Sequence, residues 1–317
     1  MTTLAPGSSP PPGVPGPTIG PPASPSAPGW YARALERASL VAERTVFFVC
    51  GCQKSGTTWL QRLLDQHAEI RCDGEGHPGD ILAPAVAMAL DAADREPRLA
   101  RKVGSEARAA TMRFVIDQTL GRYVEEAEDP AAIRCVGDKT PESAARLELL
   151  VQLHPAARVI HVIRDGRDGT VSGWAHHGRA GTQDRFATFA DYAELFARSF
   201  WVPYIRTARA VGAGLGGRYL EVRYEQLLAD PRGETGRMLE HLGVDAGESS
   251  VDACVAGASF DRLSGGRRRG QADDASHWRK GVSGEWRTAF DADALERFER
   301  HAGDLMDELG YPRGLAD

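Results

Sequence analysis

Short apolar runs alternate along the chain with segments in which apolar residues recur at helical spacing. Residues 45–50 (TVFFVC) form an apolar run that ends at Gly51, and apolar positions three and four residues apart follow it. The runs 158–163 (RVIHVI) and 219–224 (YLEVRY) also precede helical segments, and 132–136 (AIRCV) is a shorter candidate strand. Strands that alternate with helices indicate a parallel sheet with helices on both faces. We therefore expect an α/β fold built around one central parallel sheet.

The clearest helical pattern lies near the C-terminal end of the chain. Its apolar positions form one stripe, which Gly310 and Pro312 end: Leu295, Phe298, Ala302, Leu305 and Leu309. In open parallel sheets, ligands bind at the carboxyl ends of the strands. The residues that could bind a ligand or take part in catalysis follow those predicted strand ends, so we expect the functional site there.

The first 28 residues differ in composition from the rest. They hold 10 of the 19 prolines and no lysine or arginine, so they lack the cationic start of a signal peptide. We expect a disordered Pro-rich tail at 1–28 and a single domain at 29–317. The longest later uncharged apolar run, 81–90, is interrupted by Pro84 and is shorter than the roughly 20 residues that cross a bilayer. We expect a soluble protein without a membrane partner.

Charge and cysteine content narrow the class of protein. Lys plus Arg total 38 against 44 Asp plus Glu, for a formal charge of −6, so an anion site must be a local concentration of cations. The run 267–269 (RRR) has no interleaved aromatic residues, which makes a nucleic-acid partner improbable, and we expect it to be a mobile loop. Five cysteines without a C-x-x-C pair argue against a disulfide framework or a zinc site and suit a cytoplasmic protein.

The segment 51–59 (GCQKSGTTW) joins the first predicted strand to its helix. Backbone N–H groups at the helix start, one lysine and three hydroxyls can together hold a phosphate. In the P-loop of kinases and NTPases the lysine follows the second glycine, whereas Lys54 precedes Gly56 by two positions. A kinase or NTPase-like enzyme that uses ATP and Mg²⁺ is the alternative function for such a loop. The position of the lysine argues against it.

The stretch 54–59 (KSGTTW) resembles the 5′-phosphosulfate loop of the sulfotransferases that use 3′-phosphoadenosine 5′-phosphosulfate (PAPS). The resemblance implies a P-loop-like fold, a bacterial-type member of the family, and no metal ion. It also implies that the loop residues hold the phosphosulfate, with Lys54 at the leaving oxygen and Trp59 beside the cofactor; the others are Ser55, Gly56, Thr57 and Thr58. A lysine ammonium can neutralise the charge that develops on that oxygen during transfer.

Two further segments resemble the same family. An arginine after the strand 158–163 and a serine eight residues later, Arg164 and Ser172, have the spacing of the family's 3′-phosphate site. The segment 278–286 (WRKGVSGEW) resembles the family's C-terminal signature, which implies that Arg279, Lys280 and Gly281 close over the same phosphate. Tyr224 resembles a residue near the adenosine, although a tyrosine at a strand end is more often part of the core.

The sequence offers two candidates for the general base. Cytosolic members that act on small molecules have a histidine where this chain has Pro141. The sequence instead resembles the tyrosylprotein and carbohydrate branches. The resemblance to the tyrosylprotein enzymes implies that Glu75, three residues after Cys72, is the base and that Lys139 helps to stabilise the sulfuryl group. His77 is the rival base, because its ordinary pKa is about 6.5. An ion pair of Lys139 with Asp138 or Glu142 is the alternative to its catalytic role.

These residues together predict a sulfotransferase. It would move the sulfuryl group of PAPS to a hydroxyl or amine of an unidentified small-molecule acceptor, and release 3′-phosphoadenosine 5′-phosphate (PAP). A binding protein that has kept the nucleotide fold and lost catalysis is a further alternative. We expect helices in the segment 76–128 to shape the acceptor pocket.

Overall fold

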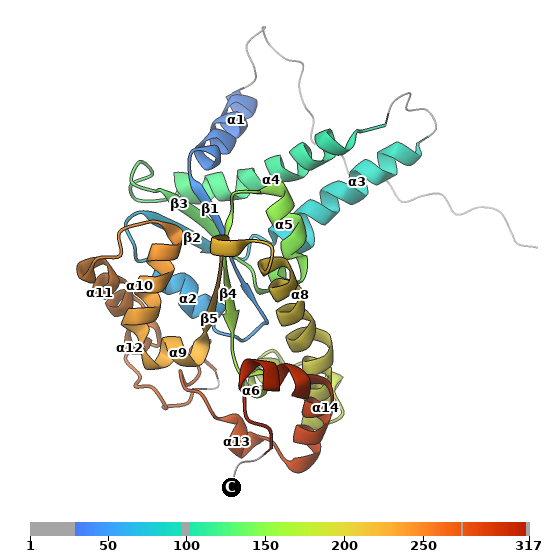
Figure 1. Ribbon diagram of the computed structural model, residues 1–317, viewed down its shortest axis with the longest axis vertical. Coiled ribbons are helices and arrows are strands. Elements are labelled where there is room, and N and C mark those ends of the chain that lie inside the picture. Colours follow the sequence, from blue (N-terminus) through green and yellow to red (C-terminus); the bar gives the residue numbers. More distant parts are fainter. Residues whose placement is uncertain (1–28, 97–101, 274, 315–317) are drawn as a thin grey trace, which may run out of the picture.

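A five-stranded parallel sheet forms the centre of this computed structural model, which describes residues 29–96, 102–273 and 275–314. The predicted tail at 1–28 lies outside the described residues. In spatial order the strands are β2 (Ile70–Gly74), β3 (Cys135–Lys139), β1 (Thr45–Gly51), β4 (Arg158–Ile163) and β5 (Tyr219–Arg223). The predicted α/β fold with a parallel sheet is confirmed (Figure 1).

Two strands differ from the sequence prediction. The edge strand β2 was not predicted, because it is only five residues long and only Ile70 and Cys72 of it are buried. The strand β3 begins at Cys135 and continues to Lys139, so the polar residues after the predicted strand belong to it. Gly137 makes this possible, since a Cβ there would come within 2.5 Å of the Phe47 ring on β1.

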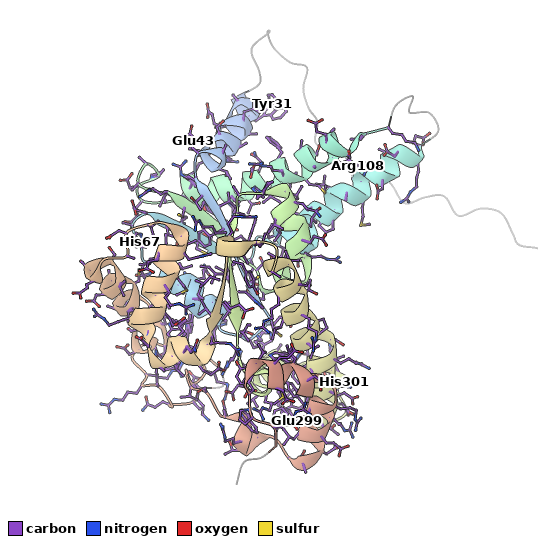
Figure 2. The ribbon with its side chains drawn as sticks, in the orientation of Figure 1. Tyr31, Glu43, His67, Arg108, Glu299 and His301 are labelled. Atoms are coloured by element: carbon purple, nitrogen blue, oxygen red, sulfur yellow. The ribbon has the colours of Figure 1, made fainter. Side chains whose placement is uncertain are left out.

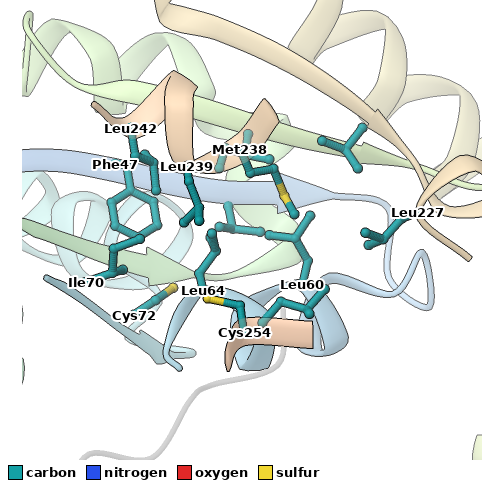
Figure 3. Close-up of a cluster of buried hydrophobic side chains, with 14 of the residues drawn as sticks. Phe47, Leu60, Leu64, Ile70, Cys72, Leu227, Met238, Leu239, Leu242 and Cys254 are labelled. Atoms are coloured by element: carbon teal, nitrogen blue, oxygen red, sulfur yellow. The ribbon is translucent and has the colours of Figure 1, made fainter. Parts of the chain in front are cut away.

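Helices cover both faces of the sheet. On one face lie α2 (Thr57–Leu64), α10 (Pro231–Leu242) and α11 (Glu248–Gly257), and on the other α1 (Gly29–Ala42), α4 (Ser105–Glu125) and α5 (Leu147–Leu153). Alternate residues of β1 point to opposite faces: Phe47 and Val49 pack with the first group, and Val46 and Phe48 with the second. Figure 3 shows the first of these cores, with Phe47 against Leu239 and Leu242 of α10.

A third core lies below the carboxyl end of β4. It joins α6 (Gly166–Arg179), α7 (Phe189–Phe196), α8 (Val202–Gly212) and α14 (Ala292–Leu309), and the last of these is the predicted C-terminal helix. The shorter helices are α9 (Tyr224–Ala229), α12 (Phe260–Leu263) and α13 (Trp286–Ala289), with π-helical segments at Pro78–Leu82 and Ala197–Trp201 and 3-10 turns at Pro141–Arg146, Gln183–Arg185 and Gly216–Arg218.

A helical pair projects from the sheet on the side away from α14 (Figure 1). It consists of α3 (Ala83–Arg95) and α4, and Arg108 on α4 joins the two helices by ion pairs with Asp91, at 2.7 Å, and Asp94 on α3 (Figure 2). Among the described helices, none combines the length and the apolar character that crossing a membrane requires.

Candidate active site

A cavity of about 700 Å³ opens where β1 and β4 end. The register pairs Val49 with Lys139 and Gly51 with Val162, so the ends of β3, β1 and β4 meet at one edge of the sheet. Most of the residues predicted from the motifs line this cavity: Lys54, Gly56, Thr57, Thr58, Trp59, Glu75, Arg164, Ser172, Tyr224, Arg279, Lys280 and Gly281. Ser55 and Lys139, which are both buried, do not line it.

The loop after β1 has the backbone of an anion cradle. Lys54 and Gly56 both have positive φ, 66° and 93°, and α2 begins directly after them at Thr57. Left-handed residues on either side of Ser55, directly before a helix start, turn backbone N–H groups toward one side, where an anion can bind. Gly56 cannot carry a side chain, since a Cβ would lie 2.5 Å from the Tyr224 ring. Tyr224 therefore packs against the loop as part of the core while it also lines the cavity.

The Lys54 ammonium is poor in counter-ions. Burial is the main cause that lowers its pKa, followed by the positive charge of Arg179, while the charges of Glu75 and Glu142 act in the opposite direction. Within the described part of the chain, no carboxylate forms an ion pair with Lys54. A cation in this state favours an anionic ligand.

Arg164 connects two of the predicted phosphate segments. Its guanidinium donates to the backbone carbonyl of Lys54 at 3.1 Å and to that of Val282 at 3.1 Å, and it lies 4.3 Å from the centre of the Tyr224 ring. Its ion pair with Asp168 is long, with 4.0 Å between Arg164 Nη2 and Asp168 Oδ2. Arg164 thus holds the loop and the C-terminal segment together at the cavity wall.

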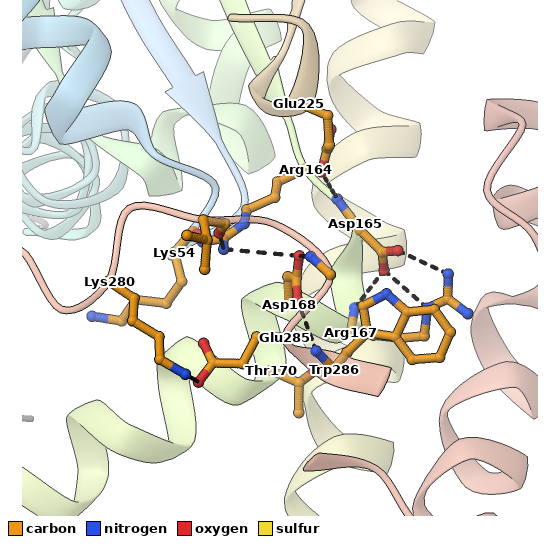
Figure 4. A network of polar contacts seen from close by, with 12 residues as sticks. Lys54, Arg164, Asp165, Arg167, Asp168, Thr170, Glu225, Lys280, Glu285 and Trp286 are labelled. Carbon is orange, nitrogen blue, oxygen red and sulfur yellow. Dashed lines mark hydrogen bonds and ion pairs between the residues drawn. The ribbon is translucent and has the colours of Figure 1, made fainter. Parts of the chain in front are cut away.

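Asp168 anchors the C-terminal segment, and the sequence analysis did not identify it. Its two carboxylate oxygens accept the N–H groups of Gly284, at 2.6 Å, and Trp286, at 3.0 Å (Figure 4). A buried ion pair lies beside it: Arg167 bonds Asp165 at 2.8 Å and stacks 3.4 Å from the centre of the Trp286 ring. The position of Asp168 four residues after Arg164, in the first turn of α6, is the only sequence signal for this role.

The two cations of the C-terminal segment share one carboxylate partner. Glu285 accepts from Arg279 at 2.7 Å and from Lys280 at 3.0 Å, and Figure 4 shows the second of these contacts. All three residues line the cavity. Gly281 has a φ of 64°, and a Cβ there would lie 2.5 Å from the Phe260 ring. The motif therefore places two cations at the cavity, together with a carboxylate that the sequence analysis did not consider.

The structure brings the two remaining predicted catalytic residues into direct contact. Lys139 donates to Glu75 Oε1 at 2.5 Å, so neither alternative partner, Asp138 or Glu142, is its main one. The Lys139 side chain is 4% exposed and that of Glu75 is 50% exposed. Burial raises the pKa of Glu75, but the bond and charge of Lys139 outweigh it, and the pKa is lowered. Glu75 is therefore ionised at neutral pH and faces the cavity.

A buried carboxylate shapes the loop that carries Glu75. Asp138 accepts from the Gly76 N–H at 2.8 Å, the Thr140 hydroxyl at 2.6 Å and the Tyr123 hydroxyl at 3.1 Å. Glu75 itself has a φ of 25°, in the left-handed region that side chains rarely adopt. These bonds hold the strained turn in place.

His77, the rival base, does not line the cavity. Burial lowers its pKa, but the bond of its Nδ1 to Asp80, at 2.9 Å, outweighs this and raises it. His77, Asp80 and Glu142 have ligand atoms close enough together to hold a metal ion, although Gln53 donates to Glu142 at 3.1 Å. Of the two candidate bases, Glu75 lines the cavity and His77 does not.

The far wall of the cavity is aromatic and comes from a different part of the chain than we expected. Its apolar residues lie on or between α6 and α8: Phe186, Tyr192, Leu195, Phe196 and Phe200. None of the described residues of the segment 76–128 lines the cavity, so that expectation is wrong. The reason is that α4 packs against α1, α3 and the sheet face instead. Polar groups of α6 complete the wall: His176, His177 and Arg179.

The run 267–269 is also built into the site. Arg267 donates to the backbone carbonyls of Trp278, Arg279 (3.0 Å) and Gln271 (3.1 Å). Arg269 lines the cavity, with its guanidinium 5.2 Å from the centre of the Trp59 ring. The run 267–269, which we expected to be a mobile loop, therefore supports the C-terminal segment.

The known proteins that this chain resembles, by sequence and by structure, include several sulfotransferases. The sequence profile of the sulfotransferase family matches residues 47–248. Sulfotransferase 1A1 of Canis lupus familiaris is 23% identical over 296 residues, which span 89% of this chain and 90% of that protein. Protein-tyrosine sulfotransferase 2 of Gallus gallus is 26% identical over 207 residues, 64% of this chain and 52% of that protein. The solved structure of mouse sulfotransferase SULT7A1 complexed with PAP has a TM-score of 0.54 at 17% identity, over 87% of this chain and 90% of that chain.

Proposed function

This chain belongs to the sulfotransferase family, and we propose that it transfers the sulfuryl group of PAPS to a hydroxyl or amine and releases PAP. One observation carries the proposal: the three segments predicted to bind phosphate groups meet at one cavity, with Lys54, Arg164, Arg279 and Lys280 among its walls. The membership agrees with the sulfotransferase prediction, and nothing in the relatives favours a kinase that uses ATP and Mg²⁺.

We assign the 5′ and the 3′ phosphate groups of the nucleotide to two different groups of residues at the cavity. We assign the 5′-phosphosulfate to the loop after β1, where Lys54 neutralises charge on the leaving phosphate oxygen and the start of α2 offers backbone N–H groups. We assign the 3′-phosphate to Arg164, Ser172 and the segment 279–281. The forked guanidinium of Arg164 suits phosphate oxygens, and Lys54 supplies the charge that a loose transfer step requires.

Glu75 is the proposed general base. It is ionised, lines the cavity and can accept the proton that the acceptor loses as the S–O bond forms. Lys139 is better described as a positioning residue than as a contact of the sulfuryl group, because its ammonium is buried and bonded to Glu75. It would reach the sulfuryl group only if this pair opened.

The aromatic wall supports a small-molecule acceptor with an apolar body, since Phe186 and Phe200 offer flat surfaces beside the cavity. A cytoplasmic location is part of the proposal, because all five cysteines are free thiols in the interior: Cys50, Cys52, Cys72, Cys135 and Cys254. Neither nucleic acid nor a membrane is among the proposed partners.

Thermal denaturation with nucleotides tests the cofactor. PAP should raise the melting temperature, because a ligand that binds only the native state at 100 times its Kd adds about 2.7 kcal/mol. Adenosine diphosphate has no 3′-phosphate and should stabilise much less. Equal shifts with the two nucleotides would remove Arg164, Ser172, Arg279 and Lys280 from their assigned role, and a preference for ATP with Mg²⁺ would favour the kinase alternative.

The test of the base must account for Lys139. Glu75→Gln should lower kcat by about 10²–10⁴-fold at unchanged PAP affinity, but it also leaves a buried ammonium without its partner. The double variant Glu75→Gln/Lys139→Met removes that charge and should be as slow as the single variant while it regains stability. Recovery of kcat in the double variant would mean that the defect of the single variant is structural. His77→Ala should stay active.

A further inference from the structure

One carboxylate neutralises two of the cations assigned to the 3′-phosphate. Glu285 forms a two-point contact with the Arg279 guanidinium and a third bond to Lys280, at 3.0 Å. Glu285 and Arg279 are each 13% exposed at their side chains, and Lys280 is 30% exposed. Such a charge-assisted, partly buried pair is stronger than a pair at the surface. The two cations are thus occupied before any ligand arrives.

The backbone around Glu285 is held independently of its side chain. The N–H groups on either side, of Gly284 and Trp286, donate to Asp168. The Trp286 ring is buried under the Arg167 guanidinium. Rotation of the Glu285 side chain can therefore release both cations without displacing the segment that carries them.

We propose that Glu285 is an internal competitor of the nucleotide 3′-phosphate: its carboxylate occupies Arg279 and Lys280 in the free enzyme and must leave when the nucleotide binds. The inference rests on the proposed function, because it takes the 3′-phosphate site from there. A phosphate monoester carries nearly two negative charges at neutral pH and a carboxylate carries one, so the phosphate wins the competition. If the carboxylate remained, like charges would repel across the site.

This competition has a consequence for turnover. The cost of displacing Glu285 weakens the binding of every ligand with a 3′-phosphate, including the product PAP. When PAP leaves, the carboxylate returns to both cations. Product release limits the rate of many enzymes. Glu285 therefore makes the release of PAP faster than Arg164, Arg279 and Lys280 alone would allow.

Calorimetric titration of Glu285→Gln with PAP tests the proposal. The amide has the same shape but no charge, so PAP should bind about tenfold more tightly, which corresponds to about 1.4 kcal/mol. Adenosine diphosphate does not reach the two cations, and its Kd should not change. In steady state, the KM for PAPS and kcat should both fall, as expected when the product leaves more slowly.

The matched control is Glu296→Gln, which removes an exposed carboxylate of α14 that pairs with Arg300 at 3.1 Å and changes the net charge equally. It should leave both nucleotide affinities unchanged. Unchanged or weaker PAP binding by Glu285→Gln would overturn the inference, as would equal tightening of adenosine diphosphate.

A second variant keeps the test decisive if Glu285→Gln does not fold. Glu285→Asp keeps the charge on a shorter side chain that cannot span both cations, and should tighten PAP by a smaller factor; no tightening would overturn the inference. A different result would contradict the proposed function: wild-type protein that does not prefer PAP over adenosine diphosphate. A wild-type preference for PAP with no effect of either Glu285 variant would leave the function standing and remove this role.

Discussion

Removal of the Asp168 carboxylate should separate the stability of the fold from the affinity for nucleotide. Asp168 is 2% exposed, and its oxygens accept the N–H groups of Gly284 at 2.6 Å and Trp286 at 3.0 Å. A hydrogen bond to a charged group contributes about 1.5–3 kcal/mol, and its loss here leaves two backbone donors without their partner. We expect Asp168→Ala to lower the free energy of unfolding by about 3 kcal/mol, and Asp168→Asn by about half of that, since the amide keeps one acceptor.

The effect on nucleotide binding should be larger than the loss of stability alone explains. Without Asp168, the segment that carries Arg279 and Lys280 has to be ordered when PAP binds, and this cost appears in the Kd. We expect PAP to bind at least about tenfold more weakly, equivalent to about 1.4 kcal/mol. Urea unfolding measures the first effect, and calorimetric titration measures the second.

Asp291 provides a matched control. It is also a carboxylate that accepts a backbone N–H, that of Ala294 at 2.8 Å, but it caps α14. Asp291→Ala should cost about 1 kcal/mol of stability and leave the Kd for PAP unchanged. The reasoning is refuted if Asp168→Ala binds PAP as the wild type does, or if Asp291→Ala weakens PAP equally.

Three further predictions follow from the site and the core. Lys54→Ala should lower kcat by at least about 10²-fold and also weaken PAP binding, because charge on the leaving oxygen develops mainly in the transition state; an effect on PAP affinity alone would contradict this. Gly56→Ala should cost at least about 2 kcal/mol in urea unfolding, since its φ is 93° and a Cβ would lie 2.5 Å from the Tyr224 ring, whereas Gly181→Ala, at a φ of 63° in open space, should cost about 1 kcal/mol. Burial lowers the pKa of three histidines to about 4: His154, His161 and His241. The unfolded chain therefore takes up protons from about pH 6.5 that the folded chain refuses, so the melting temperature should fall as the pH falls from 6.5 to 4. Burial also lowers the pKa of His176, His177 and His277, which adds to this effect. It raises the pKa of Asp117 to about 6 and also raises that of Asp65, Asp138 and Glu225, which opposes the effect. A melting temperature that rises as the pH falls from 6.5 to 4 would contradict the assignment of the histidines.

The sequence by itself determined the parts of the site that are local. The strand, loop and helix at 45–64, the strand before Arg164 and the C-terminal helix were all predicted, because apolar periodicity and the glycines at turns act over a few residues. Most of the residues predicted from the lysine, serine and arginine motifs likewise line the cavity. A parallel sheet brings its strand ends to one edge, so these motifs had to converge.

Only the tertiary structure decided which charges pair and what forms the acceptor wall. Glu75 and Lys139 are 64 positions apart, and Asp168 lies 116 positions from Gly284, so their contacts depend on strand order and helix packing. The edge strand β2 carries Glu75 to Lys139, yet its five residues bury too little to be recognised in advance. The aromatic wall comes from α6 to α8 because α3 and α4 pack on another side of the sheet. Burial and the distance between charges set these interactions, and both are properties of the folded chain.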